Sequence, residues 1–276
     1  MKIIARLPNA GLANKLLVWA EAVVFANKAN IQSNKIIVYP WVDFHPKRIL
    51  RKDNDQRLYV NFFNTNDIIS WFKSTVILNK VDNPNFNEKI QKHLSYRFST
   101  TPLPTDYFKN IRGYENVIKE ALYKIVCKEN IDFVDEFPEY DVAVHVRRGD
   151  FPKELRVSND DVLKVLERLK EHFSRELKVY LFSDGTKEEL EILLQDKNVT
   201  LIQGNKAIVD LMLMSKAKVI VPSVRSTFSY FAAFISDAHV IRHSHDNLAS
   251  IRNEKFPFYE GKNIDEISNR VEKYFK

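Results

Sequence analysis

The chain contains little cysteine and little glycine. Among its 276 residues there are one cysteine, Cys127, and only 6 glycines. A single cysteine cannot form an internal disulfide, so stability must come from the core, and the composition fits a reducing compartment. So few glycines exclude collagen-like and glycine-rich low-complexity chains. The position of each glycine is therefore informative, because glycine weakens regular structure where it is not needed.

The sequence also lacks a long apolar run. The longest, from Phe228 to Ile235, is short and contains Ser229, whereas a membrane-spanning helix needs about 20 apolar residues. Polar residues interrupt the N-terminal segment, so it does not resemble a signal peptide. We therefore expect a soluble, cytoplasmic protein. Peripheral contact with the inner face of a membrane stays open.

Charge of neither sign dominates, since 42 Lys and Arg stand against 36 Asp and Glu. The excess lies mainly in the first 140 residues, which hold 20 basic and 15 acidic residues. A diffuse surplus is weak support for nucleic-acid binding, which usually requires a clustered basic stripe. It is equally consistent with an acidic substrate or an anionic membrane surface.

The first 140 residues predict a small α/β domain. Residues 2–7 and 36–39 are typical of buried strands, and residues 12–27 predict a helix with apolar positions three and four apart. Residues 41–113 mix aromatic and charged side chains, and prolines such as Pro84, Pro102 and Pro104 interrupt them, so we expect loops and short helices there. A further helix is predicted at 116–128, and residues 132–140 are expected to form a linker.

After residue 140, apolar strands alternate regularly with amphipathic helices. The predicted strands are 142–146, 178–182, 199–202 and 218–221. This alternation predicts a parallel Rossmann-like sheet. We therefore predict two α/β domains, an N-terminal domain of residues 1–138 and a C-terminal domain of residues 139–262. A final helix, 263–276, is expected to pack back on the first domain.

The sharpest polar cluster follows the strand at 142–146. It reads His145-Val146-Arg147-Arg148-Gly149-Asp150, and strand alternation puts His145 and Arg147 on one face and Arg148 on the other. Ligands of parallel sheets bind beyond the carboxyl ends of the strands. Two arginines followed by glycine suit a phosphate clamp, because guanidinium forks bind phosphate oxygens and glycine lets backbone approach closely. The alternative is a surface ion-pair cluster with Asp150.

Three weaker clusters lie in comparable positions. Ser183-Asp184-Gly185 follows the next strand and by itself is a common turn. Asp210 interrupts an apolar helix, where it could accept hydrogen bonds from a guanine edge or pair locally. Ser226 and Thr227 begin a helix, which makes either an anion site or an ordinary N-cap. The aromatic run that starts at Phe228 has helical spacing, which favours core over a sugar platform.

Two other patterns carry less information. The turn from Asn9 to Lys15 precedes a helix but has neither the dinucleotide fingerprint nor the Walker A pattern. ATPase chemistry is therefore unsupported. His243 and His245 form a weak H-x-H pair without a matching ligand cluster, so we expect no metal site.

Together and in this order, the clusters resemble the bacterial α-1,2-fucosyltransferase family, glycosyltransferase family 11. Its motif H-x-R-R-G-D-[YF] is similar to His145–Phe151, and F-S-D-D is similar to Phe182–Gly185. Its D-L-x-L-M-S helix and S-S-F-S-x-x-x-A resemble Asp210–Ser215 and Arg225–Ala232, and its N-terminal G-x-L-G-N-Q-[LM]-F-x-Y-A resembles Gly11–Ala20. The chain departs from these motifs at several positions, so it resembles a divergent member: Ala13, Lys15, Gly185, Arg225 and Thr227.

The resemblance implies a GT-B fold, with two Rossmann-like domains facing each other across a cleft. It implies a metal-independent, inverting transfer of L-fucose from GDP-β-L-fucose to a glycan hydroxyl, with an α-1,2 linkage. The acceptor would be an oligosaccharide or a lipid-linked glycan of bacterial polysaccharide biosynthesis, and GDP-fucose is needed as donor rather than as cofactor. Other readings stay open, namely a non-catalytic nucleotide- or glycan-binding protein or a transferase for another nucleotide sugar.

The resemblance also assigns residues. The implied catalytic residues are Arg147, which would bind the β-phosphate of GDP, and Asp150, a candidate base for the acceptor hydroxyl. Asp210 would contact the guanine, His145 the nucleotide, and Ser226 and Thr227 the phosphates. The full implied donor-binding set is Gly11, Asn14, His145, Arg147, Arg148, Asp184, Asp210, Ser226, Thr227 and Phe228.

Overall fold

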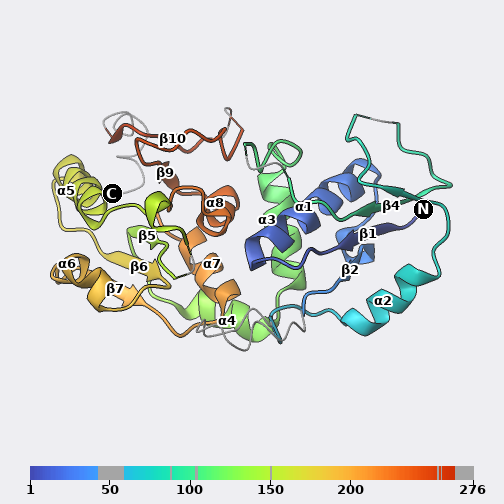
Figure 1. Cartoon of the computed structure of the whole chain (residues 1–276), viewed down its shortest axis with the longest axis horizontal. Coiled ribbons are helices and arrows are strands. Elements are labelled where there is room, and N and C mark those ends of the chain that lie inside the picture. Colours follow the sequence, from blue (N-terminus) through green and yellow to red (C-terminus); the bar gives the residue numbers. More distant parts are fainter. Residues whose placement is uncertain are drawn as a thin grey trace. The chain divides into compact units, whose positions relative to one another are not determined.

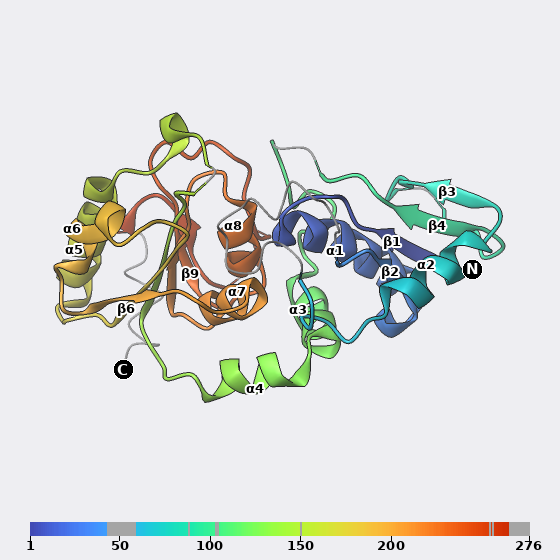
Figure 2. The same ribbon diagram turned by 60° about the horizontal axis from the view of Figure 1, so that its bottom comes forward.

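The computed structural model describes residues 1–42, 59–87, 89–102, 105–149, 151–253, 255 and 257–264. The chain divides into two compact units, Met1–Asp135 with Lys206–Ile208, and Glu136–Asn205 with Val209–Lys276. The first change of unit comes three residues before the boundary that the sequence predicts. Each unit is built on a parallel sheet with helices packed against it (Figures 1 and 2).

The first unit contains a four-stranded sheet in the order β2-β1-β4-β3. All of its pairings are parallel. Its strands are short: β1 Ile3–Arg6, β2 Ile37–Tyr39, β3 Lys80–Asp82 and β4 Ser95–Phe98. The sequence predicts β1 and β2, but the expectation of only loops and short helices in 41–113 is wrong. The sequence does not predict β3 and β4, because they are only three and four residues long and polar residues interrupt their apolar pattern.

Helix α1 (Leu12–Lys28) forms the core of this unit, as its apolar spacing predicts. It is buried nearly all round, and Trp19 and Phe25 are at most 2% exposed. A helix that is apolar on every face must be covered on every face. Its two buried charged residues have polar contacts, since Lys15 donates to the Pro40 carbonyl at 2.7 Å and Glu21 accepts from Asn110 at 2.8 Å.

Three further helices belong to this part of the chain: α2 Asp67–Thr75, α3 Glu115–Ile125 and α4 Lys128–Glu136. The expected linker at 132–140 is wrong over its first half, because α4 continues to Glu136. The fully buried Val134 anchors α4, and Lys128 pairs with Asp132 one turn later. These contacts favour a helix that ends only two residues before Pro138.

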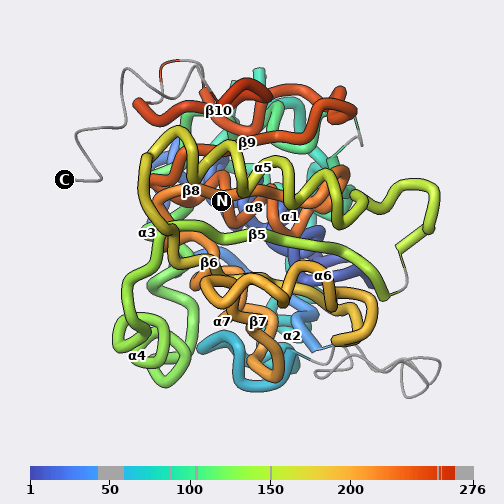
Figure 3. The backbone as a smooth tube through the Cα atoms, turned by 90° about the vertical axis from the view of Figure 1, so that its left-hand side faces the viewer, coloured from blue at the N-terminus to red at the C-terminus, as the bar shows by residue number. Residues whose placement is uncertain are grey.

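The second unit contains a six-stranded sheet in the order β10-β9-β8-β5-β6-β7, seen one above another in Figure 3. Every pairing is parallel. This is the strand order of a Rossmann fold, so the predicted parallel Rossmann-like sheet is confirmed. Its strands are β5 Val142–Val146, β6 Val179–Ser183, β7 Val199–Ile202, β8 Val219–Val221, β9 His239–Ile241 and β10 Glu260–Gly261. The last two were not predicted.

Helices cover both faces of this sheet, with α5 and α6 on one face and α7 and α8 on the other (Figure 1). Their bounds are α5 Asn159–Phe173, α6 Glu191–Leu194, α7 Ala207–Ser215 and α8 Thr227–Phe234. Ser158 caps α5, since its hydroxyl accepts a hydrogen bond from the Asp161 amide. The capping box of Thr186 and Glu189 also forms, although a 3-10 turn and the short α6 follow it.

The predicted helix 263–276 falls almost entirely on residues 265–276, which lie outside the described residues.

Candidate functional site

The strand order defines a switch point in the sheet of the second unit. From β5 the chain proceeds to β6 and β7 on one side and then returns to β8 on the other. The loops that follow β5 and β8 therefore leave the sheet in opposite directions, and ligands of such folds bind in the crevice between them. The loop after β5 carries Arg147 and Arg148, and the loop after β8 carries Ser226 and Thr227.

Arg147 lies at the edge of this switch point. Its Nη1 atom forms an ion pair of 2.5 Å with Asp184, and its side chain is 27% exposed. Its backbone N–H donates to the hydroxyl of Ser223, which belongs to the loop after β8. The side chain is therefore accessible to a ligand. Its guanidinium is tied to Asp184 in the loop after β6, and its backbone is tied to Ser223 in the loop after β8. Gly149 permits this arrangement, because the Asp184 carboxylate occupies the space that a Cβ atom would need there.

Arg148 points to the other face of the sheet, as strand alternation predicts. The residue is only 6% exposed, its Nη2 donates to Asn159 at 2.5 Å, and its Nη1 donates to the Arg147 carbonyl. Its backbone N–H donates to Asp184 at 2.7 Å. Burial lowers the pKa of its guanidinium below the usual value. These hydrogen bonds join the β5 turn to the first residue of α5.

The β8–α8 turn is built by serines. Ser223 is fully buried and its N–H donates to the Ser229 hydroxyl, while the Ser226 N–H donates to the Ser223 carbonyl. Ser226 is the N-cap of α8 but accepts no side-chain capping bond. The first amides of α8 lack intrahelical acceptors by geometry, so this end of the helix favours an anion. Thr227 and Phe228, the first residues of α8, are half-buried.

His145 is a neutral, buried imidazole at the end of β5. Burial, reinforced by the nearby charge of Arg147, lowers its pKa to about 3. Its ring lies 5.7 Å from that of Phe228, and its buried Nδ1 has no hydrogen-bond partner among the described residues. A buried polar atom without a partner is costly, so a ligand atom at this position would relieve that cost. The rest of the predicted aromatic run, including Phe231 and Phe234, is fully buried core.

Asp210 is farther along the same edge of the sheet. It lies in the first turn of α7, which follows β7, two strands away from β5. Its carboxylate accepts a hydrogen bond from Asn205 at 2.9 Å. The two predicted residues of the first unit are at the start of α1. Gly11 is the N-cap, and the buried Oδ1 of Asn14 has no partner among the described residues. Asp150, the candidate base, lies outside the described residues.

Sequence reasoning missed the residues that hold these turns in place. Arg156 donates to the carbonyls of Gly149 and Phe151, on either side of residue 150. Asn159 and Ser223 anchor the two arginines, as described above. Only tertiary contacts distinguish these residues from others of their kind. The sole local signal is that Ser223 directly follows Pro222 at the end of a predicted strand.

A second missed feature is a buried polar network behind the β8–α8 turn. The Tyr230 hydroxyl donates to Asp246 at 2.5 Å, and it accepts from the backbone N–H of Arg225. Asp246 also pairs with Arg242 at 3.0 Å. Arg225 has a positive φ of 56°, a conformation that costs energy for a non-glycine residue. The network therefore fixes the turn that begins α8.

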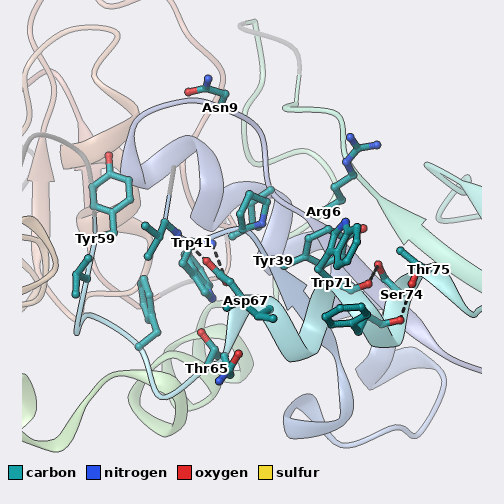
Figure 4. Close-up of a pocket in the computed structure, with 18 of the residues that line it drawn as sticks. Arg6, Asn9, Tyr39, Trp41, Tyr59, Thr65, Asp67, Trp71, Ser74 and Thr75 are labelled. Carbon is teal, nitrogen blue, oxygen red and sulfur yellow. Dashed lines mark hydrogen bonds between the residues drawn. The ribbon is translucent and has the colours of Figure 1, made fainter. Parts of the chain in front are cut away.

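The first unit has a large pocket of its own, with a volume of about 1100 Å³ (Figure 4). It lies beyond the carboxyl ends of β1 and β2, where Arg6, Tyr39 and Trp41 line it. Trp71 of α2 also contributes to the wall, and Trp41 stacks on Phe63 with ring centroids 3.8 Å apart. The pocket combines aromatic surface with a cationic side chain.

Within the described ranges, no three His, Cys, Asp or Glu side chains gather as a metal site would require. Burial lowers the pKa of His243 to about 4, whereas its neighbour His245 is exposed. No helix in the described part of the chain combines the length and the apolar character needed to cross a membrane.

Comparison with known proteins supports the fold and part of the resemblance. No protein-family model matches the chain. A curated relative, an alpha-1,2-colitosyltransferase from Escherichia coli, is 34% identical over 112 residues, which are 35% of this chain and 36% of the relative. The match therefore spans about a third of the relative's length.

Solved structures match over nearly the whole chain. The fucosyltransferase NodZ from Bradyrhizobium is 13% identical, with a TM-score of 0.57 over 89% of this chain and 99% of that one. NodZ α-1,6-fucosyltransferase soaked with GDP-fucose is 12% identical, with a TM-score of 0.54 over 90% of this chain and 97% of NodZ. The chain therefore has the GT-B fold, as predicted.

Proposed function

We propose that the chain is a glycosyltransferase that moves L-fucose from GDP-β-L-fucose to a hydroxyl group of a glycan. The observation that carries the proposal is the placement of Arg147. Its guanidinium is accessible, held by Asp184, and located at the switch point of a Rossmann sheet next to the start of α8. A nucleoside diphosphate is the ligand class that this combination of cation, helix N-terminus and strand edge favours.

The reaction explains why a fixed cation is needed there. Cleavage of the sugar–phosphate bond leaves negative charge on GDP and positive character on the sugar. A preorganised guanidinium stabilises the departing diphosphate because it needs no reorganisation during the reaction. In this proposal Arg147 binds the β-phosphate, and the Ser226 hydroxyl and the Thr227 backbone amide bind phosphate oxygens. The chemistry on the protein side is positioning and charge stabilisation.

The remaining donor contacts follow from the neighbouring side chains. His145 stays neutral at physiological pH, so it can accept or donate a single hydrogen bond without adding charge beside Arg147. Phe228 packs against its ring. We assign Asp210 to the guanine edge, and Gly11 and Asn14 to donor closure. Arg148 supports the site through its bonds to Asn159 and to the Arg147 carbonyl.

The finer features of the reaction rest on the resemblance and the curated relative. We propose inversion at the anomeric carbon, with Asp150 as the base for the acceptor hydroxyl. We also propose an α-1,2 linkage, which is the linkage in the relative's name; the NodZ enzyme is named for an α-1,6 linkage. No metal cofactor is assigned a role, and a cytoplasmic location follows from the expected use of a nucleotide sugar.

A second donor is favoured by one observation. The curated relative is named as a colitosyltransferase, and colitose is the 3-deoxy form of L-fucose. A pocket that accepts fucose can accept the smaller sugar, because a hydrophobic or loosely contacted position discriminates weakly against one missing hydroxyl. Transfer from GDP-colitose in preference to GDP-fucose would show that the 3-hydroxyl is excluded rather than recognised.

The decisive experiment measures GDP release from each donor in the presence of a broad panel of glycan acceptors. Arg147→Ala should abolish both donor binding and release. The matched control is Lys170→Ala, which removes the cation of another 2.5 Å ion pair of equal exposure, 27%, on α5. Release by the Arg147 variant at the rate of the parent protein would refute the proposal. Donor binding without release across the whole panel would favour a non-catalytic binding protein.

A further inference from the structure

An apolar surface on the first unit has no role in the donor site. It consists of Ile68, Ile69, Trp71 and Phe72 of helix α2 with Val76 and Leu78 directly after the helix, and we name these six residues the α2 face. Each is at least half exposed, from 50% for Ile69 and Trp71 to 80% for Leu78. Large apolar side chains that gather at the surface in this way mark interaction sites rather than core.

The α2 face is held in place by bonds at the start of the helix. The Asn66 side chain accepts from the Ile69 amide and caps α2. The Asp67 carboxylate accepts from the backbone amides of Trp41 and Val42, at 3.0 and 2.8 Å. Ser74 is the one buried residue of α2. The helix is therefore anchored through its ends and polar positions, while Trp71 lies in the pocket wall (Figure 4) and, like Phe72, stays at least half exposed.

The charges beside this surface are positive. Lys73 is exposed within α2, and the Lys80 ammonium donates to the Ser74 carbonyl at the end of the helix. The two carboxylates between residues 67 and 82 are engaged, since Asp67 binds backbone amides and Asp82 forms a two-nitrogen ion pair with Arg97. Residues 1–100 hold 15 Lys and Arg against 7 Asp and Glu. Most of the basic surplus of the N-terminal half therefore lies in its first 100 residues.

We propose that the α2 face docks on an anionic lipid bilayer. Tryptophan, phenylalanine and aliphatic side chains enter the boundary between headgroups and acyl chains, and the adjacent lysines bind anionic headgroups. A second copy of this chain fits less well, because a two-fold contact through the same surface brings the Lys73 side chains of both copies together. Ile68, Trp71 and Phe72 also line the pocket of Figure 4, so docking brings that pocket to the membrane surface. The proposal does not depend on the transferase activity.

Tryptophan fluorescence of the full chain with lipid vesicles tests the proposal. Trp19 and Trp41 are 1% and 2% exposed, whereas Trp71 is 50% exposed, so a change in emission on binding reports Trp71. Vesicles of phosphatidylglycerol and phosphatidylcholine in equal parts should shift the emission to shorter wavelength, and brominated acyl chains should quench it. Vesicles of phosphatidylcholine alone should bind at least about tenfold more weakly, because the headgroup attraction is lost.

A pair of double variants locates the contact. Phe72→Ser with Leu78→Ser keeps the Trp71 probe and should weaken vesicle binding at least about tenfold, by removing two inserted side chains. The control is Leu155→Ser with Ile192→Ser, which removes apolar side chains that are 39% and 42% exposed in the second unit. All four positions are exposed, so thermal unfolding should match the parent protein.

Three results would overturn the proposal. The first is equal binding to both vesicle types, and the second is equal loss of binding in the control double variant. The third is a concentration-dependent dimer that the Phe72 and Leu78 substitutions abolish without any vesicle binding by the parent chain. GDP release with a water-soluble acceptor is measured in parallel. Loss of that activity would bear on the proposed function alone, since the vesicle readout requires no turnover.

Discussion

The stem of Arg148 occupies the space where a side chain at position 185 would lie. A Cβ atom on Gly185 would come within 2.8 Å of Arg148 Cγ, 3.1 Å of Arg148 Cβ and 3.2 Å of the Ser183 hydroxyl. The φ angle of Gly185 is not positive, so backbone strain does not contribute. Arg148 cannot simply swing away, because its guanidinium is buried and bonded to Asn159. We therefore expect Gly185→Ala to destabilise the second unit through contact with this one side chain.

The magnitude follows from the two ways in which the structure can respond. If Arg148 stays, overpacking costs about 1–3 kcal/mol. If it moves, the charged hydrogen bonds to Asn159 and to the Arg147 carbonyl weaken, at about 1.5–3 kcal/mol each. The structure takes the less costly response, so we expect a loss of about 1–3 kcal/mol in the free energy of unfolding. Gly185→Asp introduces the residue that the F-S-D-D motif of the similar family has at this position. It should be at least as destabilising as Gly185→Ala.

Urea unfolding in a double-mutant cycle tests the cause. In an Arg148→Ala background the space is open, so Gly185→Ala should cost less than about 1 kcal/mol, which gives a coupling energy of about 2 kcal/mol. The control is Gly11→Ala, where a Cβ would meet nothing within 4 Å; its cost should stay below about 1 kcal/mol. Additive effects of the Gly185 and Arg148 substitutions, within about 0.5 kcal/mol, would refute the reasoning.

Two further predictions concern the donor site and the first unit. Asp184→Asn keeps an acceptor for the Arg148 amide but removes the ion pair with Arg147, so the KM for the donor should rise about fivefold, the equivalent of about 1 kcal/mol for a half-exposed pair. A lower KM would show that Asp184 competes with the donor. Burial raises the pKa of Glu21 to about 7, so the folded state favours the protonated carboxyl. The folding stability that this proton provides is fully present below pH 4.5 and is lost as the pH rises through 7. Glu21→Gln should therefore raise the free energy of unfolding at pH 8 by at most about 3 kcal/mol and leave it unchanged at pH 4; equal changes at both pH values would contradict this.

The turns of the proposed donor site could be located from the sequence because their signals are local. A buried apolar strand that stops at an arginine pair or at a serine–aspartate turn already places those side chains at one edge of a parallel sheet. The strand order brings β5, β6 and β8 together, and the ion pair between Arg147 and Asp184 is a direct consequence. What local signals could not supply is the choice among equivalent polar residues. Asn159 and Asp246 became structural partners only through tertiary contacts.

In residues 41–113, by contrast, the sequence carries no local signal for the strands that form. β3 and β4 are three and four residues long and carry Lys80, Asp82 and Arg97, so no apolar alternation marks them. They exist because the buried β1 offers an edge to which β4 adds, and β3 then adds to β4. The aromatic residues of this region, which the sequence alone could not assign, fall into a buried group and an exposed group. Trp41 and Phe63 stack in the pocket wall and are buried, whereas Trp71 lines the same pocket but is 50% exposed.

The two consecutive arginines that follow β5 have different surroundings and therefore different roles. Arg147 shares the face of His145 and meets the loop after β8, whereas Arg148 turns to α5 and is buried there. A phosphate clamp made of both guanidiniums would require Arg148 to abandon hydrogen bonds that no solvent can replace at a buried site. We therefore infer that Arg147 binds the ligand and Arg148 fixes the turn that presents it. The same inference accounts for Gly185 in this chain, since a Cβ atom there would contact the side-chain stem of the buried Arg148.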